Sequence, residues 1–230
     1  MKNAGPAGFG THPPARIRSG GIDPKPSPTF FNTPNKYFTY YCIFLILASG
    51  CAKQLSPAAR RDLDRGAVVA LTEALRRLPQ SEKYPSLNSG AVKKEARRIA
   101  QALVDQTRET NKEFKMSGGP IWHNFLIKLG VRKKGYCYHW VPELLKALPS
   151  APMRYFERHW GGSFLSLGRE NNAVIITKRG ALLTSGIVYD AWRGVGKPFW
   201  RNVAEDKKFV WRERFSEAEI LAGLAKVEAK

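Results

Sequence analysis

The residue best placed to do chemistry in this chain is Cys137, which lies between two tyrosines in the stretch GYCYHW. Its thiol is compatible with three roles, namely a buried filler, a metal ligand and a nucleophile. Pro142 follows five residues later, and a helix tolerates proline only in its first turn. We therefore expect a helix that begins near Tyr138–Val141, with Cys137 at or just before its N-terminus. There the helix dipole and the free backbone N–H groups favour the thiolate, which is the nucleophilic form.

A nucleophilic thiol needs a general base, and the base needs a third group that orients it. His139 follows Cys137 by two residues, and its side chain should diverge from the thiol at the start of the helix. His123 lies on the preceding expected helix and could pack near the same cleft. His159 ends the first expected strand and is the best base by position, although an aromatic-edge histidine at a turn is the alternative role.

Four segments of the chain, taken in order, carry a resemblance to a known family. They are WHNFLIKLG, GYCYHW, ENNAVIIT and GIVYDAWRGVG. Together they resemble the transglutaminase-like superfamily, whose fold is broadly shared with papain-like cysteine peptidases. In that family a Cys opens a helix, a His opens a later strand and an Asp lies on the next strand. The resemblance is closest to small bacterial exported members and covers roughly residues 91–211. It implies that Cys137 matches the nucleophile and Asp190 the orienting acid, although Asp190 could also simply cap a turn.

The family histidine has no counterpart, because Asn171 stands at the start of the strand where the resemblance places it. An amide cannot accept and return a proton at neutral pH, so the general-base step would be lost. The resemblance then implies a non-catalytic or weakly active domain that binds envelope peptide or wall material in the old cleft. The alternative is a working cysteine hydrolase or acyl-transferase, in which His159 or His123 is the base and Cys137 forms a thioester with an amide carbonyl.

Other residue patterns around Cys137 leave further roles open. Cys137 and His139, with His123 or His159, could supply zinc ligands, but no standard ligand spacing is present and we expect no metal or cofactor. The basic run at 131–135 could steer an anionic substrate or lower the pKa of the thiol, or it could be a solvated loop. The tryptophans could wall a cleft or fill the core, and they are Trp140, Trp160, Trp192, Trp200 and Trp211.

Helices are expected in the first part of the chain. Ser56 and Pro57 have the types preferred at an N-cap and at the first helical position. A polar linker spans 79–90, a second amphipathic helix follows, and a short apolar helix ends at Gly130. The residues expected to face the core from the two long helices are Leu63, Ala67, Leu71, Leu75, Leu78, Val92, Ala96, Ile99 and Leu103.

Strands are expected after Pro149, where short runs rich in β-branched and aromatic residues alternate with glycine-containing turns. The runs lie within 153–160, 171–179, 186–192, 197–203 and 207–211. Ser216 and Glu219 have the spacing of a capping box for a final helix. The order predicts an α+β fold in which N-terminal helices pack on an antiparallel sheet. A transglutaminase-like, papain-like core is what the resemblance implies for it.

The first 51 residues differ in kind from the rest. Residues 1–36 are rich in Gly, Pro, Ser and Thr, which predicts a disordered leader. Residues 37–51 hold an apolar run of signal-peptide length and end in LASGC, which resembles the lipobox of bacterial lipoproteins. That resemblance implies cleavage and acylation at Cys51, and the alternatives are an ordinary secretory cleavage site and a buried helix. We expect a helix and linker over 52–90 and a transglutaminase-like domain over 91–230.

The chain carries a net charge of +19, which favours an anionic partner. Cleavage would remove five of its 38 basic and one of its 19 acidic residues, which leaves +15 on the exported part. The expected partners are therefore the membrane, through the N-terminal lipid, and anionic envelope polymers or peptides, and nucleic acid is not expected. Ala52 after Cys51 indicates the outer membrane in a two-membrane bacterium. Cys137 would be the one free thiol, since Cys42 is discarded.

Overall fold

The computed structural model of this chain describes residues 56–79, 89–164 and 170–228. The expected disordered leader, the signal segment with Cys51 and most of the expected linker lie outside the described residues. Within the described ranges, no helix combines the length and the apolar character that crossing a bilayer requires.

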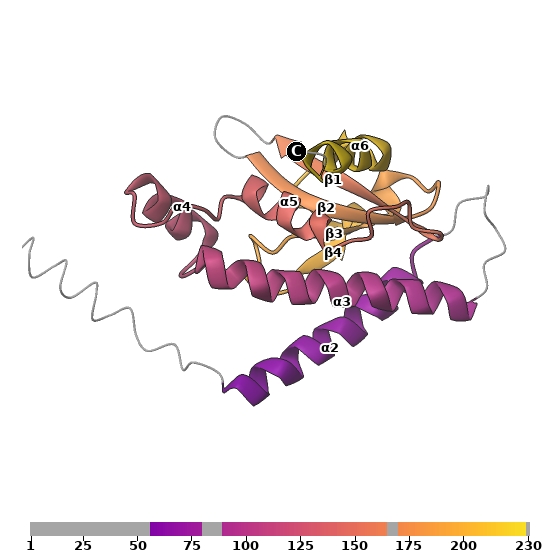
Figure 1. Ribbon diagram of the computed structural model, residues 1–230, viewed down its shortest axis with the longest axis horizontal. Helices are drawn as coiled ribbons and strands as arrows, with labels where there is room; N and C mark the ends of the chain where they lie inside the picture. The colour runs from indigo at the N-terminus through magenta and orange to yellow at the C-terminus, as the bar shows by residue number, and fades with distance from the viewer. Residues whose placement is uncertain (1–55, 80–88, 165–169, 229–230) are drawn as a thin grey trace, which may run out of the picture. The chain divides into compact units, whose positions relative to one another are not determined.

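Two long helices open the described chain, and both follow the predicted pattern. Helix α2 (Pro57–Arg76) begins at the predicted cap, where the Ser56 side chain accepts a hydrogen bond from the N–H of Ala59. Helix α3 (Ser89–Phe114) buries all four of its predicted core residues. Leu63 is exposed instead of buried, because α2 packs against the core only from Ala67 onward. In Figure 1, α2 crosses below α3, which lies between it and the sheet.

Two short helices follow, and the second carries Cys137. Helix α4 (Pro120–Lys128) is followed by Gly130, whose φ of 74° is the left-handed conformation expected after a helix. Helix α5 (Cys137–Lys146) begins slightly earlier than predicted, because Cys137 is itself its first residue. Pro142 therefore lies inside α5 rather than in its first turn, and it removes one backbone hydrogen bond from the helix.

The second half forms a five-stranded sheet in which every pairing is antiparallel. Its spatial order is β4-β3-β2-β1-β5, so four strands form a meander and the fifth returns beside the first. The strands are β1 (Phe156–Phe164), β2 (Glu170–Lys178), β3 (Ile187–Tyr189), β4 (Trp200–Asn202) and β5 (Arg212–Phe215). The mixed α+β class is therefore confirmed. The strand expected within 207–211 is wrong, because β5 starts only at Arg212.

The two faces of the sheet have separate cores, and strand alternation assigns each side chain to one of them. Val174 and Ile176 of β2 pack with α3 and α5 in the larger core. Ala173 and Ile175 point the other way and pack under the segment 203–211, which contributes Val203, Phe209 and Trp211. The segment 203–211 thus covers a face of the sheet, which explains why its aromatic residues resemble a strand in the sequence.

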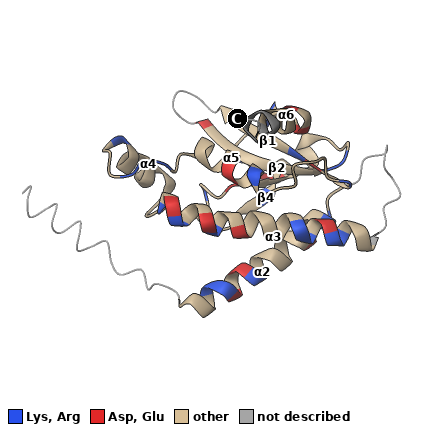
Figure 2. Cartoon of the chain, viewed as in Figure 1, with Lys and Arg blue, Asp and Glu red and all other residues tan. Residues whose placement is uncertain are grey.

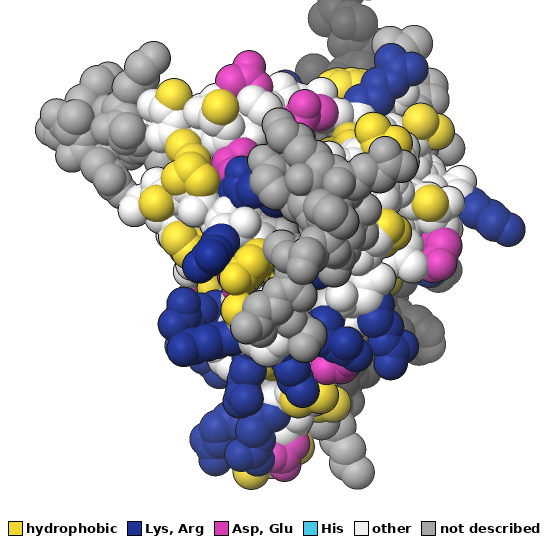
Figure 3. Space-filling model, turned by 90° about the vertical axis from the view of Figure 1, so that its right-hand side faces the viewer, with side chains coloured by type: hydrophobic (Ala, Val, Ile, Leu, Met, Phe, Trp, Pro, Cys, Tyr) yellow, Lys and Arg dark blue, Asp and Glu magenta, His cyan; other side chains and the backbone are white. Residues whose placement is uncertain are grey.

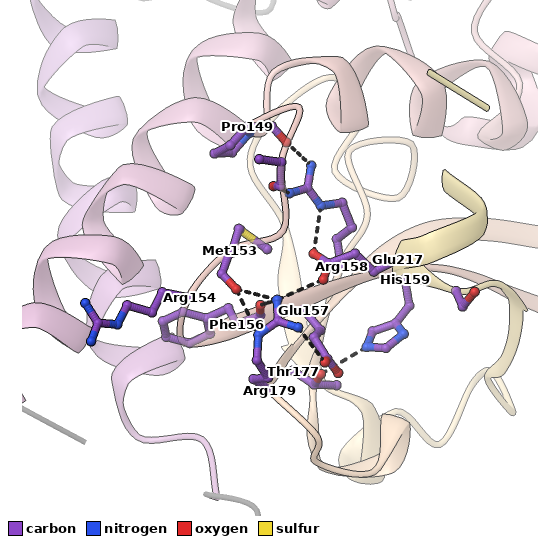
Figure 4. Close-up of polar contacts among 12 residues, drawn as sticks. Pro149, Met153, Arg154, Phe156, Glu157, Arg158, His159, Thr177, Arg179 and Glu217 are labelled. Atoms are coloured by element: carbon purple, nitrogen blue, oxygen red, sulfur yellow. Dashed lines mark hydrogen bonds and ion pairs between the residues drawn. The ribbon is translucent and has the colours of Figure 1, made fainter. Parts of the chain in front are cut away.

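The last helix, α6 (Glu217–Glu228), is attached to the sheet by a buried carboxylate. Figure 4 shows Arg158 of β1 and Arg179 converging on Glu217, at 3.2 and 2.8 Å. The predicted capping box is confirmed, since Ser216 N–H donates to the Glu219 carboxylate at 2.8 Å and the Ser216 hydroxyl accepts from Glu219 N–H at 3.4 Å. These contacts fix α6 beside β1.

Candidate functional site

Cys137 lies at the N-terminus of α5, against the first residues of strand β2. Its side chain is 6% exposed. The Asn172 amide nitrogen lies 3.7 Å from the sulfur, and the Glu170 carbonyl oxygen lies 3.8 Å from it. Gly135, with a φ of 122°, leads the chain into the helix and donates its N–H to His139 Nδ1 at 3.0 Å. The sulfur thus meets an amide and a carbonyl, and neither group is a base.

The orientation of the Asn172 amide is decided by its neighbours, which we call the Asn172 cluster (Trp160, Glu170, Asn172 and Arg214). Its oxygen accepts from Trp160 Nε1 and from Arg214 Nη1, each at 2.9 Å, and both of these groups can only donate. Its nitrogen therefore faces the other way and donates to the Glu170 carboxylate at 2.9 Å and to the sulfur. The Asn172 side chain thus presents a hydrogen-bond donor to the sulfur, and the group that accepts from the thiol is the Glu170 carbonyl oxygen, which is not a base.

Burial raises the pKa of the Cys137 thiol above its ordinary value. The Asn172 hydrogen bond favours the thiolate and opposes this shift, and the negative charge of Asp190 adds to it. The sequence led us to expect a thiolate favoured by the helix N-terminus, and the raised pKa runs against that expectation. The thiol is therefore protonated at neutral pH.

Asn171 contacts Asp190 rather than the sulfur. Its amide nitrogen donates to Asp190 Oδ2 at 2.8 Å, and its oxygen accepts from the backbone N–H of Asn172 at 2.9 Å. Cys137 and Asp190 are thus joined through two consecutive asparagines of β2. We expected Asn171 to stand in for the histidine beside the thiol, whereas the structure places Asn172 there.

Asp190 is held mainly by Arg193, three residues further along the chain. It accepts from the Arg193 backbone N–H at 2.9 Å and from Arg193 Nε at 2.7 Å. The same guanidinium forms a two-point ion pair with Asp206 at 3.0 and 2.7 Å, and it lies over the rings of Phe199 and Phe209. Asp190 thereby caps a turn and anchors a buried ion pair, which is the alternative role that its sequence position left open.

Two opposite pKa shifts follow from this ion-pair network. Burial raises the pKa of Asp190, although the Arg193 charge and the hydrogen bonds from Arg193 and Asn171 oppose the shift. Burial also disfavours the Asp206 carboxylate, but hydrogen bonds from Arg193 and Trp211 outweigh it and lower the pKa of Asp206. Arg193 is thus shared by two carboxylates, and neither contacts an imidazole.

The structure does not bring His159 to Cys137. His159 pairs in register with Ile175, so its side chain lies on the face of the sheet opposite α5. Both of its ring nitrogens are engaged there, by Glu213 at 2.5 Å and by Thr177 at 3.0 Å. Figure 4 shows its ring directed at Thr177. His159 therefore lies on the wrong face of the sheet to take a proton from the thiol.

The other two candidate histidines contact the loop before α5. His123 is fully buried, and its Nε2 lies 3.0 Å from the Lys134 carbonyl oxygen. The His139 ring accepts from Gly135 N–H, and burial together with the charge of Lys134 lowers the pKa of His139. Both histidines thus shape the loop 134–136 that delivers Cys137. Among the described residues, no group of three or more His, Cys, Asp and Glu side chains could hold a metal ion.

The remaining predicted features have structural partners. Trp140 lies in the core 5.0 Å from Phe114, measured between ring centroids. Within the basic run 131–135, Lys134 is paired with Glu113 at 2.7 Å. Trp160 was named as a possible cleft residue, whereas Glu170, Asn172, Arg193 and Arg214 were missed. The one signal for Asn172 was a second polar residue at the start of an otherwise apolar strand.

No protein-family model, no curated protein and no solved structure matched this chain. The α+β class rests on the observed helices and strands themselves. The resemblance to the transglutaminase-like superfamily rests on the four sequence segments alone.

Proposed function

We propose that this chain is a lipid-anchored protein of the bacterial cell envelope whose transglutaminase-like domain binds peptide or wall material without hydrolysing it. The domain keeps the Cys and Asp of the family triad, in Cys137 and Asp190, and lacks the base between them. The signal segment and the lipobox at Cys51 supply the argument for export and acylation. The surroundings of Cys137 supply the argument against turnover.

The observation that carries this proposal is the amide of Asn172 beside the Cys137 sulfur. Acyl transfer by a thiol needs a group that removes the thiol proton and later returns it to the leaving amine. An amide nitrogen that donates to the sulfur does neither. Because burial also raises the pKa of the thiol, neutral Cys137 is the stable form.

The Asn172 cluster has the chemistry of a peptide-binding surface. Glu170 and Arg214 are exposed and form an ion pair beside the sulfur, and Trp160 is half-buried. The Trp160 ring packs edge-on against Phe215 at 5.4 Å, and the Arg214 guanidinium lies 5.8 Å from the Phe164 ring. Donors, acceptors and aromatic rings thus lie together, which is the combination that binds an amide-bearing ligand without reacting with it.

The experiment is the alkylation of Cys137 by iodoacetamide as a function of pH, read from the mass of the tryptic peptide 135–146. A raised pKa means less thiolate at any given pH, so labelling should be slow at pH 6 and should rise with an inflection above the ordinary thiol value of about 8.5. Fast labelling at pH 6 that disappears in His159→Gln or His123→Gln would overturn the proposal and establish an active thiol–imidazole pair.

A further inference from the structure

Helix α4 exposes its apolar side chains to solvent instead of burying them. The exposed fractions are 83% for Ile121, 52% for Trp122, 45% for Phe125 and 59% for Leu129. The residue that α4 buries completely is a histidine, His123. This is the reverse of a normal surface helix, and a contiguous exposed apolar surface marks an interaction site.

The exposed residues form one continuous face. Ile121, Phe125 and Leu129 follow at intervals of four, so they lie on one side of the helix, and the Trp122 and Phe125 ring centroids are 5.5 Å apart. We call this surface the α4 face. The opposite side of α4 is fixed to the body of the molecule, since Asn124 accepts a hydrogen bond from Trp192 at 3.3 Å. Figure 1 shows α4 projecting beyond the end of α3, at the left of the view.

The segment that carries the α4 face has charges of one sign. Residues 115–142 contain five Lys and Arg and no Asp or Glu. Lys128 and Lys133 are exposed, and neither forms an ion pair with any part of the chain that the structure describes. Figure 2 shows blue and no red on α4, whereas α3 carries both colours. A negatively charged surface would therefore be electrostatically complementary to the segment that carries the α4 face, and a positively charged or neutral surface would not.

We propose that the α4 face docks on an anionic lipid surface, with Trp122 and Phe125 at the boundary between headgroups and acyl chains. A helix with aromatic and aliphatic residues on one side and basic residues at its flank lies in the membrane interface in this way. Lys128 and Lys133 then contact headgroup phosphates, and each adds electrostatic attraction. This second attachment goes beyond the proposed function, because it does not depend on acylation of Cys51.

The test uses the full chain, with Cys51→Ala so that no acyl chain contributes, and vesicles of either pure phosphatidylcholine or an equal mixture with phosphatidylglycerol. Ile121→Asp with Leu129→Asp should weaken binding to the anionic vesicles on the order of tenfold or more. The matched control is Leu182→Asp with Val210→Asp, which alters two exposed apolar residues elsewhere (77% and 66% exposed) and should leave binding unchanged.

A second measurement keeps the test independent of any binding by residues 1–50. Bromine-labelled acyl chains should quench the emission of Trp122, and Trp122→Phe should remove that quenched component while the protein stays bound. Absence of Trp122-specific quenching on anionic vesicles overturns the proposal. A second outcome also overturns it. If the parent chain sediments as a dimer, the Ile121→Asp, Leu129→Asp variant sediments as a monomer and Trp122 is not quenched, the α4 face binds a second copy of the chain. Neither result changes the expected slow alkylation of Cys137, so the two proposals can fail separately.

Discussion

Asn171 and Asn172 follow one another on β2, and their amides serve different partners. Asn172 faces the Cys137 sulfur, and Asn171 faces Asp190. A histidine at position 172 would face the thiol, whereas a histidine at position 171 would face Asp190. The chemistry of this site is therefore set by one side chain, because the helix start, the thiol and the acid are already near one another.

Asp190 should be a structural residue, and this can be measured. Asp190→Ala removes one carboxylate from the buried Arg193 guanidinium, and unfolding should become easier by roughly 3–5 kcal/mol because a buried charge loses a partner. Urea denaturation followed by tryptophan fluorescence gives the value. As a control, Asp62→Ala removes an exposed ion pair with Arg65 on α2 and should change the free energy of unfolding by less than about 0.5 kcal/mol. Equal effects of the two substitutions would show that Asp190 does not anchor the network.

At the scale of elements, the sequence pattern predicts the helices well. Ser56, the apolar stripe of α3 and the capping box at Ser216 and Glu219 are local signals, and each acts within one or two turns. Residues 207–211 were mistaken for a strand because Phe209 and Trp211 are aromatic and buried. They are buried under a sheet face rather than within a sheet, and a single sequence does not separate these two environments.

The site was predictable in its parts and not in its detail. The position of Cys137 at a helix start follows from Pro142, and the structure confirms it to within one residue. The choice between Asn171 and Asn172 did not follow, because successive side chains of a strand point to opposite faces and a shift of one residue exchanges them. The same alternation places His159 on the far face. Arg193 was missed because its partner Asp206 lies 13 residues further along the chain, beyond β4, and no local pattern links the two.

At the scale of the whole molecule, the positive charge is unevenly spread. The first half of α3 has four exposed basic residues, Lys93, Lys94, Arg97 and Arg98. Figure 3, which views the molecule from the right-hand side of Figure 1, shows Lys and Arg side chains gathered on the lower part of that face. The α4 face differs from this region because it combines basic with apolar groups. The basic surface on the first half of α3 would suit a polyanion, whereas the α4 face suits a lipid interface.

Acylation at Cys51 would attach the whole molecule to a membrane, and this proposal is tested in cells. In a bacterial host that processes lipoproteins, the protein should incorporate labelled palmitate, and Cys51→Ala should abolish the label because Cys51 is the cysteine of the LASGC motif. Cys137→Ala is the matched control and should leave the label in place. Label that persists in Cys51→Ala, or that disappears in Cys137→Ala, contradicts the proposed lipobox.

The most direct measurement compares Asn172→His with Asn171→His by iodoacetamide labelling of Cys137 at pH 6, with circular dichroism to confirm that both variants are folded. An imidazole at 172 would stand between the sulfur and the Glu170 carboxylate, so labelling should rise by about 100-fold over the parent chain. An imidazole at 171 would contact Asp190 and leave the rate unchanged. A rise in Asn171→His with none in Asn172→His would contradict the account, since the base position would then lie beside the acid and not beside the amide that now faces the thiol.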